Sequence, residues 1–598
     1  MTSSSPSSPW SPPAGVSLAW LLLGLFALFL SGLFAIVLVV LRTPFLSQWL
    51  GNALPFRSAL VLHVDLAVAV WFLSMAGFFW SWLQRESLWS WLAWGVATSG
   101  VLTMLVSPLA ESGVAVINNY LPVIHAPLFL GGLAFFVVGV AGSAALALWP
   151  GNDRESTPLA WPLRAAALVT FAALLVTGKT WLNLPQQWSV DSHWFETLFW
   201  GGGHLLQFVH TLLLIAAWWV LLRPGRESWF RWSTLLAVVP VLVALPLSWG
   251  LAVDSPDYRA FYTDLMAYGS WLWLFPTLPL LVREGKGKGV VWASAVLFVL
   301  GIGVGVAIRA DNLVVTAHYH GTVGGITLAF MGVVLHLLRP QRTDGIKVYG
   351  SGLLLLILGL LWAGLGGAPR KSIFSHLPES TWDTLLPLLL VGVGGLTALV
   401  GLFLFLLPSL AALLERLNLG QRAPMWQGGL AIVLVGVVLQ WFPAHPVASL
   451  PTPTVAQPQP QEDPELRLRF QQGAMMLHAG EYEHAVVAFH EVLSKNPRLP
   501  EAHLNMGYAM LGLQRYEAAR DFFLGAVDLR PAQANAYFGL AEAYEALEDL
   551  PAALGAMRTF IHMTHNKDPF LVRARAAVWE WEKSLKEPKG PVKLPDKH

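Results

Sequence analysis

The chain contains no cysteine among its 598 residues, and only 12% of its residues are charged. The absence of cysteine excludes disulfides, thiolate metal sites, Cys-ligated iron–sulfur clusters and covalent attachment of a c-type haem. The formal net charge of +1 gives no electrostatic support for a nucleic-acid partner. A soluble globular domain usually carries about 25% charged residues. With 55% hydrophobic residues and a mean hydropathy of +0.56, much of this chain must have the lipid bilayer as its solvent.

Long apolar runs predict a polytopic, all-α membrane protein. A helix needs roughly 20 residues to cross ~30 Å of hydrocarbon at ~1.5 Å per residue. Such runs are predicted at 15–41, 57–83, 89–107, 122–149, 160–178, 194–222, 230–252, 260–282, 289–308, 312–338, 349–366, 381–408 and 427–443. The sequence therefore predicts a twelve-span membrane domain at 15–410 and one extra span within 411–443. Residues 1–14, rich in Ser and Pro, are expected to form a disordered tail, and the Pro-rich residues 444–464 a linker.

Positive charge is distributed unequally between alternate loops, which predicts the orientation of the spans. One set of loops carries Arg85, Arg154, Arg164, Arg223, Arg226, Arg231, Arg283, Lys286, Lys288, Arg339, Arg342, Lys347, Arg416 and Arg422. The opposite set carries Arg42, Arg57, Lys179, Arg259, Arg309, Arg370 and Lys371. The more basic set is expected to face the cytoplasm, together with the N-terminus. Thirteen spans of a bacterial cytoplasmic membrane then place the C-terminal region in the periplasm.

Residues 465–585 are more polar than the preceding chain and repeat with a period of 34 residues. The recurring residues are Gly473 and Gly507, Tyr482 and Tyr516, Ala485, Ala519 and Ala553, Phe489 and Phe523, and Pro497 and Pro531. Small residues where paired helices touch, aromatic residues between them and a proline after the second helix form the tetratricopeptide pattern. A generic helical bundle does not explain so many positions at one spacing. The sequence therefore predicts a tetratricopeptide α-solenoid, whose concave face usually binds a partner protein.

Histidines inside the predicted spans are the strongest candidates for a functional site, because an ionisable side chain is costly in hydrocarbon. His318 and His320 are two residues apart, so they point about 200° apart around a helix and could serve two different haems. His63 is predicted at a similar depth in another span, as a haem held between two helices requires. His204 follows three glycines, which would let a flat macrocycle or a neighbouring helix approach closely. The alternative is that these histidines are core residues hydrogen-bonded to carbonyl groups.

Several segments resemble subunit I of the haem–copper oxidase superfamily, which includes cytochrome oxidases and nitric oxide reductases. Residues 311–320, Asp-Asn-Leu-Val-Val-Thr-Ala-His-Tyr-His, resemble the family's Asp-x-x-x-Val-x-His-Phe-His stretch. Span two from His63 onward, His-Val-Asp-Leu-Ala-Val-Ala-Val-Trp-Phe-Leu, looks closest to the nitric oxide reductase branch. Residues 257–263 resemble its Asp-Thr-Arg-Ala-Tyr-Phe-Thr motif, and residues 367–371 its Gly-Met-Pro-Arg-Arg segment. The resemblance covers roughly 15–410 and implies a twelve-span haem-binding bundle.

The resemblance assigns haem ligands residue by residue. It implies that His318 binds a high-spin haem and that His320 and His63 are the two axial ligands of a low-spin haem. Arg370 and Lys371 match the basic pair that holds haem propionates. Two haems are implied, b-type rather than a-type.

The second metal of the family is where this sequence departs from the pattern. His204 matches the family's metal-binding histidine on span six. The adjacent histidine pair on span seven is replaced by Leu247 and Ser248, the cross-linked tyrosine by Phe208, and the neighbouring glutamate by Leu206. Leucine and phenylalanine cannot ligate a metal, and serine is a poor ligand for copper. A copper centre is therefore in doubt.

Three functions remain open from the sequence. The favoured one is electron transfer through bis-His haem between a cytochrome c or quinol and partner subunits, some of them bound by the repeat domain. The second is active reduction of oxygen or nitric oxide, which needs a different metal site, for example His204 with His210. Those two residues are six apart and do not share a helix face. The third is a non-catalytic gas sensor or scaffold that recruits a protein through the repeats.

Overall fold

The computed structural model describes residues 15–42, 56–149 apart from 112 and 119, 158–185, 192–222, 227–308 apart from 286 and 287, 312–340, 344–366, 382–417, 464–564 apart from 532, and 570–586. The expected tail at 1–14, the extra span at 427–443 and the linker up to residue 463 lie outside these residues. The chain divides into two compact units. The first comprises 1–298, 323–352 and 396–449, and the second comprises 299–322, 353–395 and 450–598.

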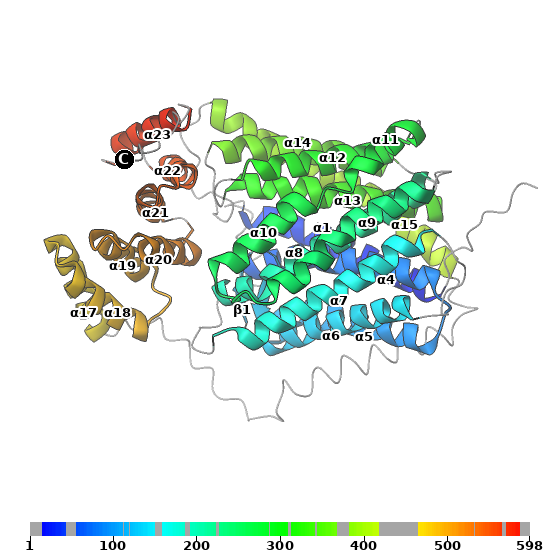
Figure 1. Cartoon of the computed structure of the whole chain (residues 1–598), viewed down its shortest axis with the longest axis horizontal. Helices are drawn as coiled ribbons and strands as arrows, with labels where there is room; N and C mark the ends of the chain where they lie inside the picture. The colour runs from blue at the N-terminus through cyan, green and yellow to red at the C-terminus, as the bar shows by residue number, and fades with distance from the viewer. Residues whose placement is uncertain are drawn as a thin grey trace, which may run out of the picture. The chain divides into compact units, whose positions relative to one another are not determined.

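Twelve segments of the described chain are helical, long and apolar enough to cross a membrane (Figure 1). They are α1 (Val16–Arg42), the continuous α3 (Phe56–Val64), η1 (Asp65–Val70) and α4 (Trp71–Leu83), α5 (Leu88–Ala110), α6 (Pro127–Leu148), α7 (Ala160–Asn183), α8 (Ser192–Leu222), α9 (Glu227–Ser248), α10 (Pro256–Gly269) with α11 (Leu274–Glu284), α12 (Gly289–Val306), α13 (Leu313–Leu338), α14 (Gly345–Leu365) and α15 (Trp382–Leu417). The predicted all-α class, with twelve candidate membrane helices, is confirmed.

Glycines bring α5 and α6 into close contact. A Cβ atom built on Gly100 would lie 2.4 Å from the carbonyl oxygen of Gly132, and one built on Gly132 would lie 2.7 Å from the carbonyl oxygen of Gly100. Only glycine lets the two backbones approach so closely at this point. Small residues are the usual means by which membrane helices gain packing contacts, because hydrocarbon supplies no hydrophobic driving force between them.

The second span is interrupted by a π-helix, η1, which begins two residues after His63. Its wider turn holds one more residue than an α-helical turn, and such insertions often occur at functional sites. Asp65, the first residue of η1, is fully buried. The α-helix resumes at Trp71 and buries most of its side chains.

A β-hairpin stands where the predicted span at 122–149 was expected to begin. Strand β1 (Val114–Val116) pairs antiparallel with β2 (Val123–His125), and α6 begins only at Pro127. The prediction was wrong over its first five residues, because a short apolar run is compatible with either a strand or a helix. Pro127 is placed at the start of α6, where its missing N–H has no hydrogen-bond partner to lose.

The predicted span at 260–282 is divided into α10 and α11. The two helices are separated by a turn over 270–273. Pro276 lies in the first turn of α11 and Pro279 lies inside it. A proline lacks a backbone N–H, so Pro276 and Pro279 cannot donate the backbone hydrogen bonds that a continuous helix over 260–282 would need from them.

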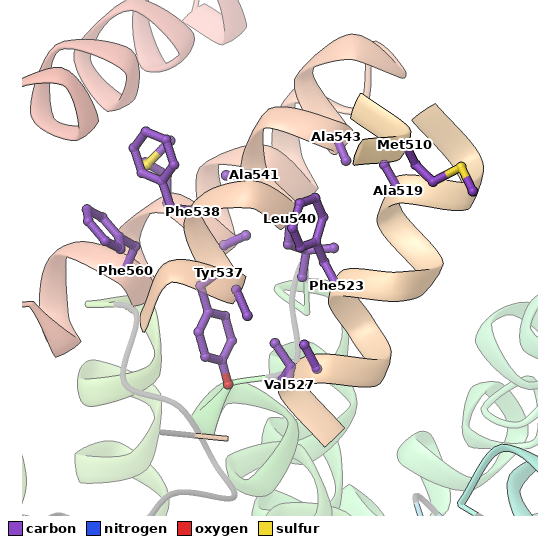
Figure 2. Packing of buried hydrophobic residues seen from close by; sticks show 14 of the residues in the cluster. Met510, Ala519, Phe523, Val527, Tyr537, Phe538, Leu540, Ala541, Ala543 and Phe560 are labelled. Atoms are coloured by element: carbon purple, nitrogen blue, oxygen red, sulfur yellow. The ribbon is translucent and has the colours of Figure 1, made fainter. Parts of the chain in front are cut away.

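Paired helices form the C-terminal region, as the 34-residue period predicts. The pairs are α17 (Pro464–Ala479) with α18 (Tyr482–Lys495), α19 (Pro500–Gly512) with α20 (Tyr516–Leu529), and α21 (Ala534–Ala546) with α22 (Leu550–Met563), followed by α23 (Leu571–Lys586). A Cβ on Gly473 would lie 2.9 Å from the ring of Phe489, and one on Gly507 would lie 2.6 Å from the ring of Phe523. The recurring glycine therefore makes room for the recurring phenylalanine. Figure 2 shows Phe523 in the shared core of these helices.

The turn inside each helix pair contains one residue with a left-handed backbone. These residues are Gly480, Gln514 and Glu548, with φ angles of 78°, 57° and 61°. Their spacing repeats the 34-residue period of the sequence. A non-glycine residue in this conformation costs about 1–2 kcal/mol. Surrounding contacts in the second and third pairs must offset that cost.

Candidate functional site

His63 is fixed by α1 at the first candidate site. Its Nδ1 lies 2.9 Å from the carbonyl oxygen of Ser31, and the Ser31 hydroxyl donates to the carbonyl oxygen of His63 over 3.0 Å. A carbonyl oxygen can only accept a hydrogen bond, so the Nδ1 atom carries the proton. The lone pair of the neutral imidazole is then on Nε2, the nitrogen that would bind a metal.

His318 and His320 have the same arrangement on α13. The Nδ1 of His318 lies 2.8 Å from the carbonyl oxygen of Gly301, and the Nδ1 of His320 lies 2.8 Å from the carbonyl oxygen of Thr316. Both Nδ1 atoms therefore donate, and both lone pairs are on Nε2. A Cβ on Gly305 would lie 2.8 Å from Nδ1 of His318, so this glycine leaves room for the ring.

These three histidines fit haem iron as ligands. Metal-binding imidazoles nearly always donate their other N–H to a carbonyl, a carboxylate or water, which fixes the ring and its tautomer. Although they lie within helices long enough to span a membrane, all three side chains are only partly buried. His63 belongs to the first compact unit, and His318 and His320 belong to the second.

Both ring nitrogens of His204 have protein partners. Its Nδ1 lies 2.7 Å from the carbonyl oxygen of Trp200, and its Nε2 lies 2.9 Å from the hydroxyl of Tyr120. The imidazole is 1% exposed. The nitrogen that would bind a metal is therefore occupied by a phenol.

Hydroxyl groups surround His204 where the resemblance predicts further histidines. The Ser248 hydroxyl lies 2.9 Å from the hydroxyl of Tyr262, whose ring faces His204 at a centroid distance of 6.3 Å. Tyr258, also buried, pairs with Thr180 at 2.8 Å. Within the residues that the structure describes, no three His, Asp or Glu side chains gather as a metal site would require.

The three glycines before His204 admit side chains of neighbouring elements. A Cβ on Gly201 would lie 2.4 Å from the hydroxyl of Tyr258, one on Gly202 would lie 2.0 Å from the hydroxyl of Thr177, and one on Gly203 would lie 2.6 Å from the ring of Tyr120. The groups that approach α8 closely at these glycines are therefore tyrosine and threonine side chains.

Lys179 lies close to this cluster. Its ammonium donates to the carbonyl oxygens of Ser248 and Leu251, at 3.0 and 3.1 Å, and lies 5.4 Å from the ring centre of Trp249. Ser248 is the last residue of α9, so the ammonium lies at the C-terminal end of that helix, where a cation is favourable. The sequence places Lys179 in a loop, whereas the structure places it inside α7.

The remaining predicted residues have different outcomes. His210 is a packing residue, with its ring 4.6 Å from that of Phe72, as expected from its separation from His204. Arg370 and Lys371 lie outside the described residues. Sequence reasoning missed Asp65, a fully buried carboxylate whose two oxygens have no hydrogen-bond partner in the described structure. An aspartate inside an apolar run was the available signal.

An open groove on the repeat domain is a candidate protein-binding surface. It is lined by Leu477, Tyr482, Tyr508, Leu511, Tyr516 and Glu542, among other residues. Burial raises the pKa of Glu542, while the guanidinium of Arg573, 2.7 Å away, opposes this effect. The groove thus combines aromatic surface with one carboxylate.

Comparison with known proteins gives relatives for the membrane region. No family model matches the chain. An uncharacterized protein of Rickettsia prowazekii is 28% identical over 488 residues, covering 65% of this chain and 94% of that protein. An uncharacterized protein of Aquifex aeolicus is 31% identical over 342 residues, covering 52% of this chain and 83% of that protein. Cytochrome c oxidase subunit 1 of Thermus thermophilus is 26% identical over 399 residues, covering 54% of this chain and 69% of that protein.

Solved structures match the repeat region. The first TPR of Spaghetti, bound to an HSP90 peptide, is 18% identical and covers 21% of this chain and 95% of that chain, with a TM-score of 0.20. The Sgt2 TPR domain from Aspergillus fumigatus is 20% identical and covers 23% of this chain and 91% of that chain, with a TM-score of 0.20.

Proposed function

Because the chain belongs to the family of the Aquifex aeolicus protein and is a distant relative of cytochrome c oxidase subunit 1, we propose that it is the haem-binding membrane subunit of a respiratory-type electron-transfer complex. One observation carries the proposal. His63, His318 and His320 each donate from Nδ1 to a backbone carbonyl, which leaves the lone pair on Nε2. His204 shares this tautomer, but its Nε2 is hydrogen-bonded to the hydroxyl of Tyr120.

The three histidines have separate roles in this proposal. His63 and His320 would be the ligands of a low-spin haem, and His318 would be the ligand of a second haem. Arg370 and Lys371 bind the haem propionates. A haem bound by these imidazoles would supply one-electron transfer. Ser31, Gly301 and Thr316 keep the imidazoles oriented through their carbonyl oxygens.

Electrons pass between a cytochrome c or a quinol and partner subunits of the complex. The loop charges support a cytoplasmic N-terminus and a periplasmic repeat domain. In that position the groove lined by Tyr482, Tyr508 and Tyr516 would bind a periplasmic segment of a partner subunit.

The test is a pyridine haemochrome assay with metal analysis on the purified chain. We expect haem, predominantly b-type, and a sharp reduced α-band. His63→Ala should abolish that band, because a six-coordinate iron would lose one ligand. His210→Ala is the matched control, since His210 packs against Phe72 and serves no haem in this proposal. A chain without haem, or an α-band that survives in His63→Ala, would contradict the assignment.

Active reduction of oxygen or nitric oxide is the second candidate, favoured by the relationship to cytochrome c oxidase subunit 1. It requires a diatomic molecule bound between haem iron and a second metal. The hydrogen bonds of His204 and the hydroxyl of Ser248 argue against that second metal. Consumption of either gas at several turnovers per second, with about one copper per chain, would favour this candidate.

A further inference from the structure

The hydrogen bond between Tyr120 and His204 has a fixed direction. The carbonyl oxygen of Trp200 accepts from Nδ1 of His204, so Nε2 has no proton and must accept. The hydroxyl of Tyr120, 2.9 Å away, is therefore the donor. The imidazole of a helix is thus joined to the phenol of a loop, with both of its nitrogens satisfied inside the bundle.

The backbone at Tyr120 and Leu121 is held by the side chain of Asn118. Tyr120 lies between β1 and β2, and the side chain of Asn118 accepts from the backbone N–H groups of Tyr120 and Leu121, each over 2.9 Å. The amide of Asn118 also donates to the carbonyl oxygen of Leu121 over 2.6 Å. A side chain that bonds the backbone two and three residues ahead fixes a tight turn. The backbone that carries the phenol is therefore fixed by hydrogen bonds with Asn118.

Helix α8 provides a matching notch for the phenol. A Cβ on Gly203 would lie 2.6 and 2.8 Å from two ring atoms of Tyr120. The ring also lies against Trp200, with centroids 5.4 Å apart. Shape and hydrogen bonding therefore hold the same side chain in the same place.

The hairpin is packed against the helix that carries His63. Val116, Val123 and Ile124 are buried in one cluster with Val61 and Leu62, which immediately precede His63. Both strands contact α3. Anchoring the hairpin to α8 therefore supports the segment of α3 that ends at His63.

We propose that Tyr120 and His204 form a buried latch that fixes the β-hairpin to α8, and that His204 is a positioning residue and not a metal ligand. The latch replaces the second metal centre that the resemblance predicts at this histidine. Its function is mechanical: it joins α8 to the hairpin, and through the hairpin to the segment before His63. This inference stands on contacts within the first compact unit and does not require haem.

The experiment is hydrogen exchange of the full-length protein, read by mass spectrometry over residues 113–126. Tyr120→Phe removes only the donor and keeps the ring in its notch. One hydrogen bond contributes about 0.5–1.5 kcal/mol, so amides of the hairpin should exchange about twofold to tenfold faster. His204→Leu should accelerate the same amides, and the double variant should exchange no faster than the faster single variant. Tyr258→Phe is the matched control: it loses a bond of 2.8 Å to Thr180, away from the hairpin, and should leave hairpin exchange unchanged.

Copper, zinc and iron content and the visible spectrum are measured on the same samples. The proposal expects both to be the same in the wild type and in His204→Leu. Unchanged hairpin exchange in Tyr120→Phe overturns the latch, and that variant alone decides the matter if His204→Leu does not fold. Loss of a metal or an altered spectrum in His204→Leu overturns the assignment of His204 as a positioning residue. Absence of haem from the wild type would refute the proposed function and leave the latch intact, because hairpin exchange is measured without reference to haem.

Discussion

Replacing Gly203 by alanine should expel Tyr120 from α8. The added Cβ would lie 2.6 Å from one ring atom of Tyr120, 2.8 Å from a second and 3.2 Å from the Cβ of the tyrosine. These atoms belong to the rigid part of the side chain, and they are near a loop held by Asn118. A small shift of a flexible end therefore cannot relieve the overlap, and the hairpin must move.

The expected size of the effect follows from the cost of overpacking, about 1–3 kcal/mol. Alanine is a better helix former than glycine by about 1 kcal/mol, but that gain applies to α8 whether the hairpin is attached or not. It therefore cancels from the equilibrium between attached and detached hairpin. Converted to exchange rates, about 1–3 kcal/mol corresponds to roughly 5-fold to 150-fold faster exchange of the hairpin amides.

Hydrogen exchange over residues 113–126 measures this change, and Gly178→Ala is its control. Gly178 also lies inside a membrane helix, α7, but a Cβ built there meets no atom within 4 Å. The control has the same chemical change and the same gain in helix propensity without the overlap. Hairpin exchange in Gly203→Ala within about twofold of that in Gly178→Ala would refute the reasoning, since one hydrogen bond alone is worth more.

Three further predictions concern the repeat domain. Met475→Cys, at a residue that is 65% exposed, should react with an impermeant thiol reagent in intact cells, and protection until lysis would contradict a periplasmic location. Gly507→Ala should lower the unfolding free energy by up to about 2 kcal/mol, because the overlap of its Cβ with the buried ring of Phe523, 2.6 Å away, costs about 1–3 kcal/mol and the helix propensity of alanine offsets about 1 kcal/mol. Thermal proteolysis of the full chain measures this loss, and adding Phe523→Leu should recover part of it. Burial lowers the pKa of His562 from its ordinary value of 6.5, so the folded domain favours the neutral imidazole. Above pH 6.5 the imidazole is neutral in both states; as the pH falls below 6.5, the unfolded chain binds the proton more readily than the folded domain, so the free energy of unfolding falls. Melting by proteolysis at pH 7.5 and pH 5.5 should show a larger loss in the wild type than in His562→Gln, and an equal loss would contradict the role of this residue.

The sequence indicates the candidate iron ligands but not the atoms that orient them. His63, His318 and His320 stand out because ionisable residues are rare in hydrocarbon. Their carbonyl partners are a different matter. Ser31 and Gly301 lie on other helices. Every residue type has a backbone carbonyl, so the sequence does not indicate which carbonyl accepts from a given histidine.

The partner of His204 also escaped prediction for a physical reason. Tyr120 is 84 residues away along the chain, in a segment whose first strand the sequence predicts as loop and whose second strand it predicts as helix. No feature of the neighbouring sequence indicates that this loop tyrosine packs inside a helical bundle. In the repeat domain, by contrast, the contact between Gly507 and Phe523 can be predicted from the 34-residue period, because each repeat packs its two helices in the same way.

The π-helix η1 lets α3 and α4, the two halves of the second span, orient their side chains independently of each other. In an uninterrupted α-helix each residue is turned by about 100° from the last, so the direction of His63 would dictate the direction of Ser74. The extra residue in η1 shifts that phase between them. The later half can therefore keep Trp71 and Ser74 against Gly24 of α1 while the earlier half takes whatever angle His63 needs. Removing one residue between 65 and 70 would again fix the direction of Ser74 relative to that of His63. Either the packing of α4 against α1 or the orientation of the His63 imidazole would then change.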